Sequence, residues 1–312
     1  MPIFRSLVII SNAAAALLLI FQGAQALGAV TDPGNPEGTY KAIGKAQSVA
    51  EVDYLIRQFF AINYSIGILS GEFELGINAR SKVISGAFID GSDLTAYRQF
   101  ARIFVEEWSK YPSELVRGSG LSTLAFVRSV STAVGNTVEN SGAFLDGNTI
   151  YFSVNKGVGN PEHLRHIIHH EFFHVIDLNR WVTFLPDPWA GITQESGGWY
   201  GAGGLNARDP NLSNALHPLA SFVTGYATSS ILEDRAELFS FLMTTSLYPL
   251  LWRWSQDDSY LAAKANLMLQ FLNSKLSSQI NLNFIENMIL NSQATSVRIA
   301  KEEAAGAAAQ AK

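Results

Sequence analysis

The chain has 312 residues, of which 47% are hydrophobic and 16% are charged, and its formal net charge is -5. This composition is typical of a globular protein with a substantial core, in one or two domains, and not of a disordered chain. The acidic balance gives no electrostatic reason to expect nucleic acid or an anionic membrane surface as a partner. Because the chain contains no cysteine, disulfides and thiolate zinc ligands are excluded, so histidines and carboxylates are the remaining metal ligands.

The start of the chain has the organisation of a secretory signal peptide. Arg5 supplies a positive charge, residues 7–21 form an apolar run, and residues 24–26 form an Ala-Gln-Ala cleavage motif. An uncleaved anchor is the alternative, but the run is short for a bilayer span and two polar residues interrupt it. We therefore expect residues 1–26 to be a signal peptide, the mature protein to be secreted or periplasmic, and no stable membrane association after signal removal.

The remaining chain divides by composition. Residues 27–39 are rich in turn-forming residues and predict a linker. We expect a single domain over residues 40–295, with a helical N-terminal part at 40–110 and a core that carries the chemistry at 111–295. The last stretch, rich in Ala, Gly and Gln, predicts a flexible tail over residues 296–312.

Apolar spacing predicts the main elements ahead of residue 160. Helical spacing predicts two helices, over residues 49–62 and 94–108. Residues 121–130 favour a strand, and residues 142–154 resemble a hairpin that turns at 146–147 or 147–148. We therefore expect an α+β fold with a small mixed sheet and a mainly helical remainder.

Residues 160–177 concentrate five of the six histidines of the chain on one predicted helix. Residues 170–174 match the pattern H-E-x-x-H. Positions i and i+4 lie one above the other on a helix, so His170 and His174 project toward one point, as two ligands of a tetrahedral Zn²⁺ do. Glu171, at the edge of the same face, is badly placed to be a third ligand and is the natural general base. The alternative is a His-rich amphipathic helix whose imidazoles are solvated or hydrogen-bonded.

A long segment rich in Gly, Pro and Asn follows this helix, at residues 179–218, and contains several Trp and Tyr residues. Long irregular loops in compact domains are often functional. We expect the segment to form the rim of a cleft, with some aromatic residues contacting substrate and others anchoring the loop to the core. His217, at its end, is more often structural than catalytic in such a setting.

A second helix is predicted over residues 233–243, with Glu233 and Glu237 on one face at i and i+4. A carboxylate from this helix, meeting the two imidazoles, completes a His₂Glu site with a fourth position left for water, as catalysis requires. Glu233 is the expected zinc ligand. Glu237, one turn deeper, is expected to orient a ligand histidine through the other ring nitrogen of that histidine.

Asp177, three residues after His174, is a second candidate for orienting a ligand histidine. The alternative for Asp177 and Glu237 is a surface position or an ion pair with Arg235 or Arg180.

The first motif has the pattern H-E-F-x-H-x-x-D, and a Tyr lies seven residues before the Glu that begins a second pattern, E-x-x-A-E-x-F. Together these two patterns resemble the catalytic core of a group of gluzincin metallopeptidases. The group includes anthrax toxin lethal factor, the Pro-Pro endopeptidases and the Mlc titration factor A peptidases. The resemblance covers residues 170–243 and implies a zincin-like fold, zinc as cofactor and a peptide or protein substrate. It also implies that the Tyr, Tyr226, donates a hydrogen bond to the oxyanion. Arg235, Phe173 and the long gap between the two motifs depart from the pattern.

These features predict a secreted zinc metallopeptidase in which Glu171 moves the proton and Tyr226 stabilises the oxyanion. In metallopeptidases an edge strand commonly holds an extended substrate, and residues 150–154 are the preferred candidate strand because they lie close to the histidine helix. The competing prediction is a noncatalytic secreted binding protein with a structural or degenerate metal site. A fourth protein ligand from His166, His217 or Asp177 would favour it. A metal hydrolase with another substrate class is a third alternative.

Overall fold

The computed structural model describes residues 34–71, 82–134, 137–201 and 215–310. The signal peptide expected over residues 1–26 lies outside these ranges, as does the first part of the expected linker. Among the described residues, no helix combines the length and the apolar character that crossing a membrane requires.

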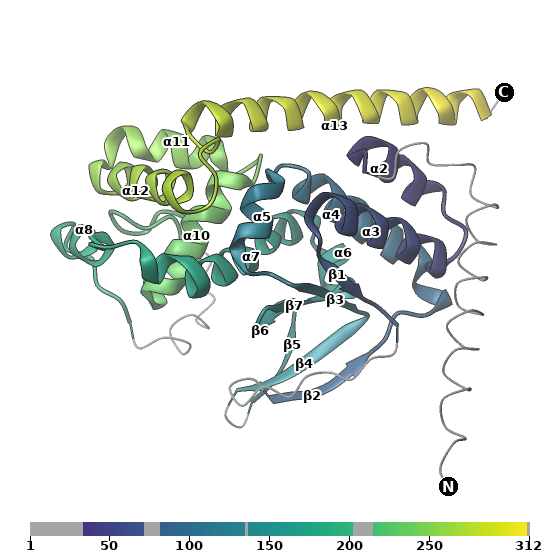
Figure 1. Ribbon diagram of the computed structural model, residues 1–312, viewed down its shortest axis with the longest axis horizontal. Coiled ribbons are helices and arrows are strands. Elements are labelled where there is room, and N and C mark those ends of the chain that lie inside the picture. Colours follow the sequence, from purple (N-terminus) through teal and green to yellow (C-terminus); the bar gives the residue numbers. More distant parts are fainter. Residues whose placement is uncertain (1–33, 72–81, 135–136, 202–214, 311–312) are drawn as a thin grey trace, which may run out of the picture.

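The fold is α+β, as the sequence predicted, with two small sheets and a mainly helical remainder (Figure 1). The strands are β1 Gly67–Leu69, β2 Lys82–Ala87, β3 Thr123–Val127, β4 Ser129–Val134, β5 Thr137–Ser141, β6 Ala143–Asp146 and β7 Thr149–Ser153. The helices up to the histidine motif are α2 Pro36–Lys45, α3 Val49–Tyr64, α4 Leu94–Trp108, α5 Ser113–Ser119, α6 Val154–Gly159 and α7 Pro161–Arg180. The later helices are α8 Trp189–Glu195, α10 Ile231–Met243, α11 Tyr248–Asp257, α12 Ser259–Lys275 and α13 Leu282–Gln310. Within the described residues, the short 3₁₀ helices η1 Gly91–Asp93, η2 Trp181–Thr183 and η4 Tyr226–Ser229 lie between them.

The larger sheet has the strand order β1-β3-β7-β6 and is mixed, because β1, β3 and β7 run parallel while β6 runs antiparallel to β7. The hairpin predicted over residues 142–154 is therefore confirmed as β6 and β7. Asp146 pairs with Thr149, so the turn is Gly147-Asn148, and Gly147 adopts the left-handed φ of +58° that favours glycine there.

The strand predicted over residues 121–130 is divided between two sheets. β3 belongs to the larger sheet, whereas β4 pairs with β2 and β5 in a separate antiparallel sheet. The division falls at Arg128, whose backbone N–H donates to Ala87 O at 2.8 Å and whose side chain binds Asp93. Because the backbone of Arg128 bonds to β2, the chain leaves the larger sheet at this residue, and one β-favouring run forms two strands.

The predicted helix at residues 94–108 is confirmed as α4, and its apolar face builds the core. Phe104 on α4 meets Phe126 of β3 and Phe152 of β7, each with ring centroids 4.8 Å apart. The predicted apolar positions of this helix are fully buried: Tyr97, Phe100, Ala101, Phe104, Val105 and Trp108. Helices α3, α4 and α5 lie over this sheet in Figure 1. The core therefore lies between these helices and the larger sheet.

The two ends of the described chain are more regular than the sequence indicated. Part of the expected linker forms the start of α2, because Asn35 caps it by accepting from the backbone N–H of Glu37 at 3.0 Å. The tail expected to be flexible over residues 296–312 is helical as far as Gln310, and its Ala, Glu and Lys residues favour a helix. This last helix, α13, extends from α11 and α12 to α2 (Figure 1).

Candidate metal centre

Helix α7 carries the histidine motif and has the start that its sequence predicted. The side chain of Asn160 accepts a hydrogen bond from the backbone N–H of His163 at 3.2 Å, and Pro161 occupies the first helical turn. The core side of the helix is apolar and buried: Leu164, Ile168, Phe172 and Val175. Burial of this face fixes the rotation of the helix, so His170 and His174 are directed to the side where α10 packs.

Three ligand atoms from two helices meet at one point. His170 Nε2 lies 3.0 Å from His174 Nε2 and 3.0 Å from Glu233 Oε2, and His174 Nε2 lies 3.3 Å from the same carboxylate oxygen. Glu233 lies in the first turn of α10, where Ser230 caps the helix by accepting from Glu233 N. The structure therefore brings together the three residues that the sequence proposed as zinc ligands, and their role as ligands stays a prediction.

The geometry of these atoms fits a tetrahedral zinc ion. Zinc bonds of 2.0 to 2.2 Å place neighbouring ligand atoms about 3.3 Å apart, close to the separations found here. Glu233 Oε2 is buried and has no aligned hydrogen-bond donor, although both imidazoles are near it. A buried carboxylate oxygen left in that state is costly unless a cation satisfies it. The donor set of two imidazoles and one carboxylate is one that zinc accepts.

The electrostatics of the site also favour a cation. Burial alone would lower the pKa of His170, but the neighbouring Glu233 and Glu237 carboxylates raise it well above its usual value. Burial alone would raise the pKa of Glu233, but the neighbouring His170 and His174 hold it far below its usual value. A field that stabilises a positive charge between two ionised carboxylates also stabilises a bound divalent cation.

Glu237 lies behind His170, on the side away from Glu233. His170 Nδ1 is 2.8 Å from Glu237 Oε1, although the pair is not aligned as a strong hydrogen bond. His166 Nε2 lies 2.9 Å from the same oxygen, and Thr224 Oγ1 donates to the other carboxylate oxygen at 2.8 Å. Glu237 therefore lies where a residue that orients His170 must lie, and its role in orienting a zinc ligand stays a prediction.

His166, His170 and Glu237 form a second group with ligand atoms close together. Hydrogen bonds account for this group, because His166 Nδ1 meets Ser240 Oγ at 3.0 Å while its Nε2 meets Glu237. Both nitrogens of His166 therefore lie within hydrogen-bonding distance of a protein partner. We therefore regard this group as support for His170 and not as a separate metal site.

Asp177 pairs with Arg235, the alternative that the sequence left open. Arg235 Nη1 donates to Asp177 Oδ1 at 3.1 Å, its other amine group binds Asp187, and its guanidinium lies over the Trp181 ring at 4.3 Å. In the part of the chain that the structure describes, no hydrogen bond joins Asp177 to His174. Burial raises the pKa of Asp177, and the Arg235 charge opposes that rise.

None of the three residues proposed as a fourth protein ligand joins the His170–His174–Glu233 group within the described ranges. His166 is engaged by Ser240 and Glu237, and Asp177 by Arg235. His217 contacts Phe222 O through Nδ1 at 2.9 Å and stacks on a tryptophan ring. A site with three protein ligands is the kind that leaves a position for substrate or water.

A cleft of about 600 Å³ lies beside the three ligand atoms, and Glu171 and Tyr226 both line it. Its remaining lining is Ala143, Asn160, Glu162, His163, His166, Ile167, His170, Leu216, Thr224, Glu237, Phe241 and Leu247. No hydrogen bond or ion pair joins the side-chain carboxylate of Glu171 to another described residue, so this carboxylate is available to a ligand in the cleft. Burial raises the pKa of Glu171, and the neighbouring His174 and His170 oppose the rise.

Tyr226 stands at the start of η4, with its ring 5.8 Å from the His170 ring. Burial raises the pKa of Tyr226, and the charges of Glu233 and Glu171 raise it further. The phenol therefore keeps its proton at neutral pH and can donate a hydrogen bond.

The segment at residues 179–218 contains two buried anchors and one exposed aromatic side chain in its described part. Trp181 and Trp189 are buried, in η2 and α8, so they hold the segment to the core. Trp199 is 67% exposed and is available to a ligand. Residues 202–214 lie outside the described ranges.

The prediction that residues 150–154 form the substrate-binding edge strand is wrong. These residues form most of β7, which lies between β3 and β6 and has both edges paired. β6 is the edge of the sheet on this side, and its Ala143 lines the cleft. Proximity in sequence to α7 misled the choice, because strand order depends on which distant strands pair.

Several residues that surround the site were not singled out from the sequence. Thr224, Glu107, His169 and Lys264 all make buried polar contacts near α7 or α10. A charged or polar residue within an apolar helical face, as at Glu107 in α4, is the signal that could have indicated them.

No protein-family model matches the chain, and no curated protein matches it. Among solved structures, the chain is similar to the crystal structure of a candidate zinc-binding metallo-peptidase from Bacteroides caccae. The TM-score is 0.50 at 15% sequence identity, over 78% of this chain and 91% of that chain. At this identity the likeness shows the fold, and it agrees with the α+β arrangement expected from the sequence.

Proposed function

We propose that this protein is a zinc-dependent peptidase whose zinc ligands are His170, His174 and Glu233. One observation carries the proposal: two imidazole nitrogens and one carboxylate oxygen lie 3.0 to 3.3 Å from one another beside a cleft. The carboxylate oxygen is buried and has no aligned hydrogen-bond donor. The fold, similar to that of a candidate zinc-binding metallo-peptidase, supports it.

In the proposed reaction, water adds to the carbonyl carbon of a peptide bond and the C–N bond breaks. A zinc ion held by the three ligands supplies a Lewis acid that polarises this carbonyl. Glu171 accepts a proton from the attacking water and passes it to the leaving amine nitrogen. In the metal-free protein, burial raises the pKa of Glu171, and a carboxylate with a higher pKa binds a proton more readily. Tyr226 donates a hydrogen bond to the oxyanion that forms on the carbonyl oxygen.

We further propose that the site belongs to the gluzincin type and resembles in arrangement the group that includes anthrax toxin lethal factor. The support is the sequence pattern, in which Tyr226 precedes Glu233 by one short segment, together with the position of Tyr226 on the cleft.

The proposed substrate is an extended peptide or protein segment. Support comes from β6, which is an edge strand among the described residues, so its outer side can add a peptide strand by main-chain hydrogen bonds. The signal-like N-terminal sequence supports action outside the cytoplasm, in the periplasm or in the medium.

The test is cleavage of a mixed peptide library by the mature protein, with and without a zinc chelator, followed by addition of zinc. We expect cleavage that the chelator abolishes and zinc restores. The competing function is that of a noncatalytic binding protein. A protein that binds one zinc ion through these ligands and yet leaves every peptide intact would support that competitor and remove the peptidase proposal.

A further inference from the structure

A buried ionic cluster lies against α7 on a different side from the cleft, and Glu107 of α4 is its centre. Glu107 is 1% exposed. Its carboxylate forms close ion pairs with Lys110 and with Arg165, and it lies 2.7 Å from His169 Nε2. Burial alone would raise the pKa of Glu107, but these three partners hold it far below its usual value, so the group stays ionised.

The cluster fixes the orientation of His169, the residue next to the proposed ligand His170. His169 is fully buried, and its Nδ1 meets the hydroxyl of Tyr111 while its Nε2 meets Glu107. An ionised carboxylate can only accept, so Nε2–H donates to Glu107 and Nδ1 accepts from the Tyr111 hydroxyl. With both nitrogens engaged, this turn of α7 has one favourable position against α4.

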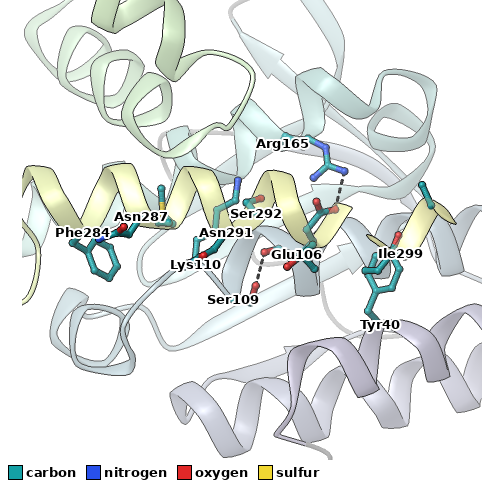
Figure 2. A pocket seen from close by; sticks show the side chains of 13 residues that line it. Tyr40, Glu106, Ser109, Lys110, Arg165, Phe284, Asn287, Asn291, Ser292 and Ile299 are labelled. Carbon is teal, nitrogen blue, oxygen red and sulfur yellow. Dashed lines mark hydrogen bonds and ion pairs between the residues drawn. The ribbon is translucent and has the colours of Figure 1, made fainter. Parts of the chain in front are cut away.

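The same cluster reaches α10. Lys110 Nζ donates to the backbone carbonyl of Met243, the last residue of α10, at 3.1 Å. Arg165, one turn before His169, also pairs with Glu106 at 2.8 Å, a contact that Figure 2 shows beside Lys110 in a cavity under α13. One carboxylate thus joins α4 to two points on α7 and, through Lys110, to the end of α10.

The placement of α7 against α10 decides whether the ligand atoms can meet. α7 supplies both imidazoles, and α10 supplies the carboxylate. A shift of one helix along the other by a fraction of a turn would separate them by more than a ligand bond, since the helix rises roughly 1.5 Å per residue.

We propose that Glu107 is a positioning residue for the metal centre. It holds α7 and α10 at the offset that brings His170 Nε2 and Glu233 Oε2 to 3.0 Å. This inference rests on the proposed function in one respect, because it takes His170, His174 and Glu233 as the zinc ligands.

The test compares Glu107→Gln with Glu106→Gln in the full mature chain. Glu106 is the matched control, because it neighbours Glu107 on α4 and also pairs with Arg165, whereas the carboxylate that His169 and Lys110 pair with is that of Glu107. Zinc affinity is measured by competition with a chelator, and ligand geometry by the visible absorption of the cobalt-substituted protein. We expect Glu107→Gln to weaken zinc binding roughly 10- to 100-fold and to shift the cobalt spectrum. Glu106→Gln should leave both measurements unchanged.

A second variant keeps the test decisive if Glu107→Gln does not fold. Tyr111→Phe removes only the hydroxyl that meets His169, and it should weaken zinc binding in the same direction by a smaller factor. Folded variants with lowered thermal stability but unchanged zinc affinity and cobalt spectrum would overturn the proposal. Failure of both variants to fold would also overturn it, since the cluster would then act on folding alone.

These outcomes are independent of peptide cleavage. A wild-type protein that binds zinc and cleaves nothing would contradict the proposed function but leave the role of Glu107 intact. Normal zinc binding in both Glu107→Gln and Tyr111→Phe would contradict the role of Glu107 and leave the proposed function intact.

Discussion

At the scale of single residues, the first two turns of α10 show how one short sequence serves the whole site. Its charged residues point in several directions, because successive side chains on a helix lie roughly 100° apart around the axis. The pairs are Glu233 with His170 and His174, Asp234 with Lys264, Arg235 with Asp177, and Glu237 with His166 and His170.

Glu171→Gln tests the proposed base. The amide keeps the shape of the side chain but cannot accept the proton, so we expect kcat to fall roughly 10²- to 10⁴-fold. Zinc content, measured by metal analysis, should not change because Glu171 is not among the three ligand residues. Glu162→Gln, an exposed carboxylate on the same cleft, is the control and should retain activity. Full turnover by Glu171→Gln would refute the role of the base.

Tyr226→Phe tests the proposed oxyanion donor. Loss of one such hydrogen bond should lower kcat roughly 10- to 1000-fold with little change in KM, because the bond forms in the transition state. Steady-state kinetics on one peptide, with zinc content measured in parallel, separates this effect from loss of metal. Tyr54→Phe, on α3, is the control and should behave as wild type. An unchanged kcat would remove Tyr226 from the mechanism.

At the scale of elements, a second buried network fastens the segment that carries Tyr226. Asp234 Oδ2 accepts from Trp189 Nε1, from the Tyr200 hydroxyl and from Lys264 Nζ, each at 2.7 Å. Lys264 also donates to the carbonyl of Ser221 at 2.9 Å, and both charged residues are fully buried. Helices α8, α10 and α12 and the chain before η4 are thereby joined at one carboxylate.

Lys264→Met should destabilise the protein strongly, because it leaves Asp234 as a buried charge without its cation. We expect the free energy of unfolding to fall by about 3–5 kcal/mol, measured by denaturant titration of the metal-free protein. Lys275→Met changes an exposed lysine on the same helix and should cost less than about 0.5 kcal/mol. Equal losses in the two variants would show that Lys264 and Asp234 do not act as a buried pair.

Local sequence patterns predicted many of the helices and strands. Periodic apolar residues predicted α4 and α7, and Gly147 predicted the hairpin of β6 and β7, because these signals act over neighbouring residues. The tail is helical as far as Gln310, because an Ala-rich composition favours a helix as well as a flexible chain.

At the scale of the whole molecule, long-range pairing is what local sequence could not predict. The spacing of His170, His174 and Glu233 indicated a site, because helix periodicity places these side chains on defined faces. The partners of that site were not predictable in the same way, since Glu107 and Lys264 reach it only through the tertiary packing of α4 and α12. The order of the parallel strands, which decides the edge strand, also depends on pairing between distant segments.

The most direct test of the central claim is a crystal structure of the zinc-loaded protein, with anomalous diffraction measured on both sides of the zinc absorption edge. We predict one strong peak about 2 Å from His170 Nε2, His174 Nε2 and a Glu233 carboxylate oxygen, with no fourth protein ligand. A peak between His166 and Glu237, or no zinc peak at the Glu233 site, would contradict the account.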